Sequence, residues 1–264
     1  MLGIVNVTPD SFSDGGRHST TDAAVGHALQ LVEEGAHLLD IGGESTRPGA
    51  AAVSIDEECE RVLPVIEALM KRAPRTPISI DTSKAEVARR ALAAGATLVN
   101  DVTALSDPRM GAVIAEANAA VCLMHMQGTP RTMQVKPEYG DVVHEVAESL
   151  ADAIDRAVAA GIDRSRVLID PGIGFGKTLE HNLLLLRHLE AFRALGAPIL
   201  LGTSRKSFLG ALTGERDAAK RLIPSVASVA VAAAQGTADV VRVHDVAATR
   251  EALLVAKAIR LGAR

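Results

Sequence analysis

The sequence predicts an α/β fold, a (β/α)8 (TIM) barrel formed by one domain over residues 1–264. Short apolar or β-branched segments alternate with alanine-rich helical segments, and eight such pairs can be counted, each strand ahead of its helix. Continuous apolar strands are typical of parallel sheets that are buried on both faces. A chain of 264 residues, of which 48% are hydrophobic, has the length and the core expected of this barrel. The alternative is an open doubly wound sheet, which usually contains fewer units.

The first four units occupy residues 3–118. Gly35 and Gly95 lie just past two of the helices, where a glycine commonly ends a helix, and a strand follows each of them. The expected strands are residues 3–7 (GIVNV), 37–42 (HLLDIG), 77–81 (PISID) and 97–101 (TLVND), and the expected helices lie near 22–34, 56–72, 84–94 and 109–118.

The last four units occupy residues 121–261. Gly161, Gly196 and Gly236 again mark the ends of helices. The expected strands are residues 121–125 (VCLMH), 166–170 (RVLID), 198–202 (PILLG) and 239–244 (DVVRVH), and the expected helices lie near 141–160, 181–194, 218–235 and 247–261.

Two of the loops that follow strands are long. One covers residues 6–21 (NVTPDSFSDGGRHSTT) and the other residues 126–140 (MQGTPRTMQVKPEYG). Both come after the carboxyl ends of strands, the end of a (β/α)8 barrel that carries active sites. We therefore expect them to serve as lids or binding loops.

The composition argues against several classes of protein. The net charge is −4 and no run of Lys or Arg reaches four residues, so a nucleic-acid partner is not expected. Cys59 and Cys122 are too few and too distant for a disulfide framework, which predicts a cytoplasmic protein. The amino terminus lacks the charged region of a signal peptide, and the longest apolar run, residues 226–234, is too short to cross a membrane.

The segment DPGIGFGKT, residues 170–178, resembles a phosphate-binding loop but departs from its pattern. A P-loop requires glycine five residues before Gly176, and Pro171, which has no N–H to offer, lies there instead. The G-x-G-x-x-G pattern also fails, because Lys177 stands where its last glycine would be. The segment is a glycine-rich loop after a strand, with the carboxylate of Asp170 at its head.

Polar residues end every expected strand, whereas the first halves of the strands are almost wholly apolar. A single aspartate in such a place is more often a cap or turn residue, but eight polar ends that meet at one rim indicate a site. The strand ends carry Asn6, Asp40, Asp81, Asn100 with Asp101, His125, Asp170, the Ser204-Arg205-Lys206 segment, and Arg242 with His244.

The residue types at this rim constrain the ligand. Buried carboxylates need paired donors, and an amino-pyrimidinone edge offers two parallel N–H groups to an acceptor set such as Asp81, Asn100 and Asp170. Lys206 could donate to the ring carbonyl, and Met124 offers a flat apolar wall. A second set suits the oxygens of a phosphate: Arg47, Arg242, His244 and Asn6. A salt-bridged rim without a ligand would not explain why donors and acceptors fall on different strands.

Eight motifs, in order along nearly the whole chain, resemble those of the bacterial dihydropteroate synthases. They are NVTPDSFSDGG (6–16), GGESTRPGA (42–50), ISIDTSK (78–84), NDV (100–102), LMHMQGTP (123–130), DPGIGFGK (170–177), SRKSFLG (204–210) and RVHDV (242–246). The resemblance implies a (β/α)8 transferase of folate biosynthesis, a sulfonamide target, that joins p-aminobenzoate to a dihydropterin diphosphate and releases pyrophosphate. It also implies a homodimer.

The resemblance assigns a role to particular residues of this chain. Positions that hold the pterin are matched by Asp81, Asn100, Asp170 and Lys206, with Met124 and Phe175 beside the ring. Asn6, Arg242 and His244 match the diphosphate site, where Mg²⁺ also binds, and Asn6 is the expected metal ligand. The p-aminobenzoate pocket and its loops are matched by Thr46, Arg47, Pro48 and Ser207, and the first loop by Phe12 and Asp14.

Two other functions remain open at this point. A methyltetrahydrofolate-dependent methyltransferase domain would share the pterin carboxylates but would have no diphosphate to hold, which the set Asn6, Arg242 and His244 argues against. A non-catalytic pterin-binding paralogue is opposed by the presence of every expected site residue. For the synthase we expect substitution at the exocyclic CH2 of the pterin by an SN1-like path, with departure of pyrophosphate as the difficult step.

Overall fold

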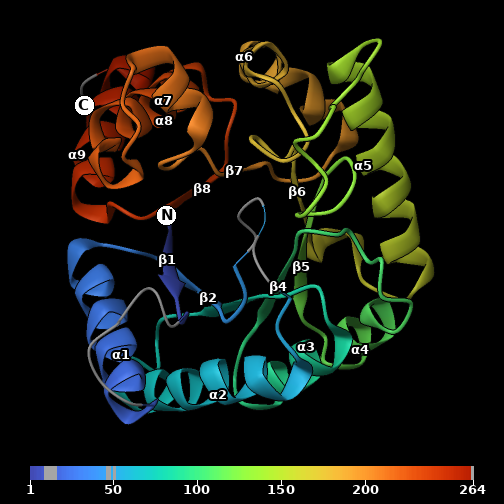
Figure 1. Cartoon of the computed structure of the whole chain (residues 1–264), viewed down its shortest axis with the longest axis vertical. Helices are drawn as coiled ribbons and strands as arrows, with labels where there is room; N and C mark the ends of the chain where they lie inside the picture. Colours follow the sequence, from blue (N-terminus) through green and yellow to red (C-terminus); the bar gives the residue numbers. More distant parts are fainter. Residues whose placement is uncertain (9–16, 46–48, 50–51, 263–264) are drawn as a thin grey trace.

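The computed structural model describes residues 1–8, 17–45, 49 and 52–262, and it shows a barrel of parallel strands inside a ring of helices (Figure 1). The eight strands follow the order β6-β5-β4-β3-β2-β1-β8-β7. A parallel bridge between Ile169 and Ile199 joins the two ends of this order, next to a hydrogen bond from the Ile169 N–H to the Pro198 carbonyl. The predicted (β/α)8 barrel is therefore confirmed, and the open doubly wound sheet is excluded.

The elements lie close to their predicted places. The strands are β1 Leu2–Asn6, β2 Leu38–Gly42, β3 Ile78–Asp81, β4 Leu98–Asp101, β5 Ala120–Met124, β6 Val167–Asp170, β7 Leu200–Leu201 and β8 Val240–Val243. The α-helices of the described chain are α1 Arg17–Glu34, α2 Ile55–Arg72, α3 Ala85–Ala93, α4 Met110–Glu116, α5 Val142–Ala159, α6 Leu179–Arg187, α7 Ser207–Thr213, α8 Leu222–Gln235 and α9 Val246–Leu261.

Several helical regions differ from the prediction. The helix α1 begins at Arg17, so the last residues of the loop expected over 6–21 are helical. The helix expected near 218–235 is interrupted at Arg221, with a 3-10 turn, Ala218–Lys220, ahead of α8. The helix expected near 181–194 leaves the α conformation at His188 and continues as a 3-10 helix, Leu189–Leu195. Side chains three residues apart line up in a 3-10 helix, and this brings Leu189 and Phe192 together into the core, each fully buried. The helix α7, which sequence reasoning missed, is an extra short helix between β7 and α8.

The barrel interior has an apolar layer below a polar one. The lower layer contains Leu2, Leu98, Cys122 and Leu200, with Leu38, Ala120, Leu168 and Val240 packed against them. Side chains two residues apart on a strand point to the same face. The next interior residues along β2, β4, β6 and β8, two positions beyond this layer toward the carboxyl ends of the strands, are therefore Asp40, Asn100, Asp170 and Arg242.

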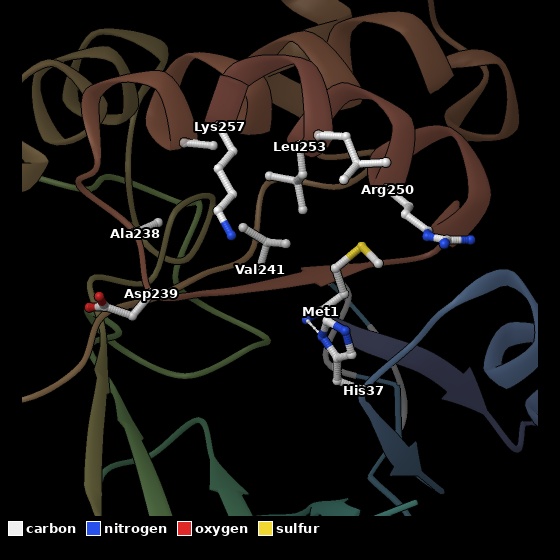
Figure 2. A pocket seen from close by; sticks show the side chains of 10 residues that line it. Met1, His37, Ala238, Asp239, Val241, Arg250, Leu253 and Lys257 are labelled. Atoms are coloured by element: carbon white, nitrogen blue, oxygen red, sulfur yellow. Dashed lines mark hydrogen bonds between the residues drawn. The ribbon is translucent and has the colours of Figure 1, made fainter. Parts of the chain in front are cut away.

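A cavity of about 340 Å³ lies at the amino-terminal ends of the strands, opposite the polar layer (Figure 2). Met1 and His37, which precede β1 and β2, line it together with Arg250 and Lys257 of α9. The amino-terminal nitrogen lies 3.0 Å from His37 Nδ1. This cavity is remote from the polar strand ends, and its lining includes none of the predicted site residues.

None of the helices in the described part of the chain is long and apolar enough to span a membrane. Cys59 and Cys122 are both buried, and neither forms a disulfide.

Candidate functional site

Asp40 organises the polar layer inside the barrel. It is fully buried, and its Oδ2 accepts hydrogen bonds from Asn100 Nδ2 at 3.1 Å and from Arg242 Nε at 2.6 Å. Asp40 Oδ1 is buried without a hydrogen-bond partner among the described residues. Asp40 on β2 thus fixes side chains from β4 and β8 at the carboxyl end of the barrel.

Arg242 joins this group to Asp81 on β3. Its Nη2 lies 2.7 Å from Asp81 Oδ2, so one guanidinium bridges two carboxylates. Burial raises the pKa of Asp81 to about 7, against the lowering influence of Arg242. Burial lowers the pKa of Arg242, but the two carboxylates outweigh it and raise the pKa above its ordinary value. Arg242 therefore stays charged and holds the acceptors of the interior in place.

Asp170 and Lys206 form the second part of the layer. Asp170 Oδ1 accepts the backbone N–H of Gly172 at 2.7 Å, which fixes the orientation of the carboxylate. Burial raises the pKa of Asp170, while the Gly172 N–H and the charge of Lys206 oppose the shift. Burial also lowers the pKa of Lys206 to about 8, with Asp170 acting in the opposite direction. A single buried carboxylate with a fixed lone-pair direction suits a ligand that presents N–H groups.

An apolar wall stands beside these groups. Met124 at the end of β5 and Phe175 in the loop after β6 are buried in one cluster with Val102 and Met133. Lys206 Nζ lies 3.8 Å from the centroid of the Phe175 ring, within cation–π distance. Gly174 has a φ of +83°, and a Cβ there would approach Lys206 Cδ to 3.1 Å. A flat ring could therefore stack on this wall while its edge meets Asp170.

The loops after β7 and β8 are joined by hydrogen bonds and an ion pair. Ser204 Oγ lies 3.0 Å from His244 Nδ1 and accepts a hydrogen bond from the backbone N–H of His244. Arg205 has a φ of +59°, in the left-handed region, and its guanidinium donates to both oxygens of Asp245 at 3.0 and 2.5 Å. Ser225 Oγ accepts the Arg205 N–H at 2.8 Å. These contacts fix the direction of the chain at Lys206 relative to His244.

The expected metal ligand Asn6 ends β1 and is half-buried. In the described ranges no cluster of three His, Cys, Asp or Glu residues has the arrangement of a metal site. Mg²⁺ commonly binds through one or two protein oxygens together with substrate phosphates, so the amide oxygen of Asn6 fits such a site only in company with a diphosphate.

Five of the predicted residues lie outside the described part of the chain: Phe12, Asp14, Thr46, Arg47 and Pro48. Ser207, the remaining residue expected near p-aminobenzoate, is exposed at the first position of α7, directly after Lys206. The structure thus brings together predicted residues at the ends of strands and in the loops after them, namely Asp81, Asn100, Met124, Asp170, Phe175, Lys206 and Arg242.

A family model described as pterin binding enzyme matches residues 2–244 of this sequence. This chain belongs to that family. The dihydropteroate synthase of Escherichia coli strain K12 is 49% identical over 258 residues, which cover 98% of this chain and 90% of the relative. The family membership agrees with a site built to hold a flat heterocycle at the carboxyl end of the barrel.

Solved structures of this pterin-binding family resemble the chain closely. The Xanthomonas albilineans dihydropteroate synthase with 4-aminobenzoic acid is 53% identical, with a TM-score of 0.92 over 98% of this chain and 92% of that one. The same enzyme in complex with 7,8-dihydropteroate is matched at 50% identity, with a TM-score of 0.89 and the same two coverages. The chain is therefore a transferase of the dihydropteroate synthase type.

Three features of the site escaped sequence reasoning. Asp40 was recognised as a strand end, but its place at the centre of the Asn100 and Arg242 contacts was not. The Arg205–Asp245 pair gave no signal beyond two charged residues near strand ends. Lys177 had no assigned role, yet it is almost fully buried. Asp40, Arg205 and Asp245 lie at or soon after strand ends, which was their only signal, whereas Lys177 lies farther on, at the end of the glycine-rich loop after β6.

Proposed function

We propose that the chain condenses p-aminobenzoate with (7,8-dihydropterin-6-yl)methyl diphosphate, giving 7,8-dihydropteroate and pyrophosphate. The observation that carries this proposal is the interior polar layer, in which Asp170 and Asn100 are buried acceptors and the cationic Lys206 lies above the Phe175 ring. This pattern is complementary to the amino-pyrimidinone edge and carbonyl of a pterin.

The chain's own residues bind and orient the substrate. Asp170 is held by the Gly172 N–H with one oxygen, so its other oxygen is directed for the donors of the pterin ring. Met124 and Phe175 provide apolar surface for the ring face and exclude water from it. Lys206 is positioned to donate to the ring carbonyl. We infer that a ring held by these contacts directs its exocyclic CH2 toward the ends of β1 and β8.

The reaction exchanges one bond at that carbon. The CH2–O bond breaks with its electron pair leaving on pyrophosphate, the amine nitrogen of p-aminobenzoate forms the new C–N bond, and the nitrogen then loses a proton. Because the pterin ring delocalises positive charge, we infer an SN1-like path. We infer that His244 and the cationic Arg242 act on the leaving group, because stabilising the negative charge that it gains lowers the barrier. Mg²⁺, held by Asn6 together with the diphosphate, would neutralise part of the same charge.

We also infer that the protein forms a homodimer through α8 and α9. These two helices pack against each other and leave large apolar side chains exposed. Exposed apolar patches of this kind mark protein interfaces. They include Ile223 (79% exposed) and Val231 (58%) on α8, and Leu254 (60%), Val255 (60%) and Ile259 (74%) on α9. Light scattering on the purified protein tests the inference, and a monomer at micromolar concentration would contradict it.

The proposed location is the cytoplasm, which the two free, buried thiols support.

One assay separates the proposed synthase from the two other pterin-binding functions. The protein is incubated with dihydropterin diphosphate and Mg²⁺, with or without p-aminobenzoate, and pyrophosphate release is followed. A synthase releases pyrophosphate together with an equal amount of dihydropteroate when p-aminobenzoate is present. A methyltransferase domain or a non-catalytic binder forms no dihydropteroate under either condition, and that result would overturn the proposal.

A further inference from the structure

Lys177 is a buried lysine that the proposed reaction does not use. It lies in the loop after β6, and only 3% of it is exposed. Its Nζ is 2.9 Å from the Phe175 carbonyl oxygen, 2.9 Å from His125 Nδ1 and 3.5 Å from the His125 carbonyl oxygen. No carboxylate of the described residues forms an ion pair with it. A buried ammonium is costly unless its hydrogen bonds compensate, so these contacts define what Lys177 does.

The two segments that Lys177 joins form two sides of the apolar wall. His125 directly follows Met124 at the end of β5, and Phe175 projects from the loop after β6. The segments touch at Gly172, whose φ is +69° and where a Cβ would come within 1.8 Å of the His125 carbonyl oxygen. Lys177 therefore bridges two loops that are already in backbone contact.

Three successive carbonyl oxygens of the loop after β6 each accept a hydrogen bond from a side chain. The Gly174 carbonyl accepts from Gln134 Nε2 at 2.8 Å, and the Gly176 carbonyl accepts from Tyr139 Oη at 2.9 Å. Between them, the Phe175 carbonyl accepts from Lys177 at 2.9 Å. Of these three bonds only the one from Lys177 is buried. Its loss leaves a buried carbonyl unsatisfied, which costs more than the loss of a bond that water can replace.

The electrostatic surroundings agree with a holding role. Burial lowers the pKa of Lys177 to about 7, with Asp170 opposing the shift. Burial and the charge of Lys177 lower the pKa of His125 to about 3, so the imidazole is neutral. A neutral imidazole can accept a hydrogen bond at Nδ1 from Lys177 Nζ, which donates in both its charged and its neutral form.

We propose that Lys177 is a positioning residue of the pterin site, which ties the Phe175 carbonyl to the end of β5 and thereby keeps the Phe175 ring beneath Lys206. The inference rests on the proposed pterin-binding function. Lys206 Nζ lies 3.8 Å from the centroid of that ring. If the Phe175 backbone shifts, the ring no longer supports the ammonium, and Lys206 loses its position against the pterin carbonyl.

The test compares Lys177→Met with Tyr139→Phe. Methionine fills a similar volume without donating a hydrogen bond, and phenylalanine removes the neighbouring bond to the same loop. Calorimetry with a pterin that lacks the diphosphate measures affinity, and thermal unfolding checks the fold. We expect Lys177→Met to weaken pterin binding by about tenfold or more, because it leaves the buried Phe175 carbonyl without a donor, and Tyr139→Phe to stay within about twofold. In turnover, Lys177→Met should raise KM for the pterin more than it lowers kcat.

A double-mutant cycle shows whether Lys177 acts through Phe175. In a Phe175→Leu background, Lys177→Met should cost much less affinity than it does in the wild type. Wild-type affinity in Lys177→Met, equal losses in Lys177→Met and Tyr139→Phe, or full additivity with Phe175→Leu would each overturn the proposal. If Lys177→Met does not fold, Lys177→Gln takes its place in the comparison, and failure of both to fold would show a purely structural role and also overturn it.

Absence of pterin binding by the wild type would instead refute the proposed function. The two failures are therefore distinguishable.

Discussion

Replacing Asp170 with asparagine exchanges one acceptor for a donor in the pterin site. Asp170 Oδ1 accepts the Gly172 N–H at 2.7 Å, so the amide oxygen of the asparagine must keep that place. The NH2 group then stands where Oδ2 stood, and it faces the N–H groups of the ring. Losing a charge-assisted pair and gaining this repulsion should cost about 2–4 kcal/mol, or about 30- to 700-fold in affinity.

Calorimetry with a pterin lacking the diphosphate measures the effect of Asp170→Asn. Burial raises the pKa of Asp170, which means that the charged carboxylate is disfavoured by its surroundings, so the neutral amide should leave the thermal midpoint unchanged or higher. Asp239→Asn is the matched control, because it removes a carboxylate whose Oδ2 accepts the Ile199 N–H at the other end of the barrel. Wild-type affinity in Asp170→Asn, or an equal loss in Asp239→Asn, would refute the assignment of Asp170 to the pterin.

Three further predictions follow from the charges of the site. Because the pKa of Lys206 is lowered to about 8, its ammonium is lost as the pH rises through 8, and pterin affinity should fall over that range. Calorimetry at pH 6.5–9.5, about 1.5 units to either side of that pKa, measures this fall. In Lys206→Met, affinity should change with pH only as far as the ligand itself titrates. Arg242→Ala leaves the buried Asp40 and Asp81 without their cation and should lower the free energy of unfolding by about 3–5 kcal/mol. His244→Ala should be as stable as the wild type but should bind pyrophosphate more weakly. Equal stabilities of the two variants in denaturant titrations would contradict this prediction. p-Aminobenzoate and a sulfonamide mimic should bind weakly to the empty protein and tightly once pyrophosphate and Mg²⁺ are bound, because the cationic loops expected around them need an anion to become ordered. Equal affinities in the two conditions, measured by calorimetry, would show a preformed pocket.

Much of the fold follows from local patterns. Continuous apolar strands alternate with helices, and parallel strands place all their carboxyl ends at one rim, so the polar residues that end them could be predicted to meet. The short helix α7 could not be predicted, because its seven residues are too few for a periodic pattern, and it is held by burial of Phe208 and Leu209.

The contacts inside the site are set by residues far apart in the sequence. Arg242 and Asp40 are 202 positions apart, and Lys177 and His125 are 52 apart. A strand end shows that a side chain reaches the rim, but barrel closure decides which partner it meets. For this reason Arg242 was assigned from sequence only to the diphosphate, whereas the structure shows that it also holds Asp40 and Asp81.

A crystal structure of the protein with a bound pterin tests the central claim most directly. The account predicts the amino-pyrimidinone edge of the ring against Asp170 and Asn100, its face on Met124 and Phe175, and its carbonyl at Lys206. A pterin found in the cavity beside His37 and Arg250, or elsewhere outside the interior polar layer, would contradict the account.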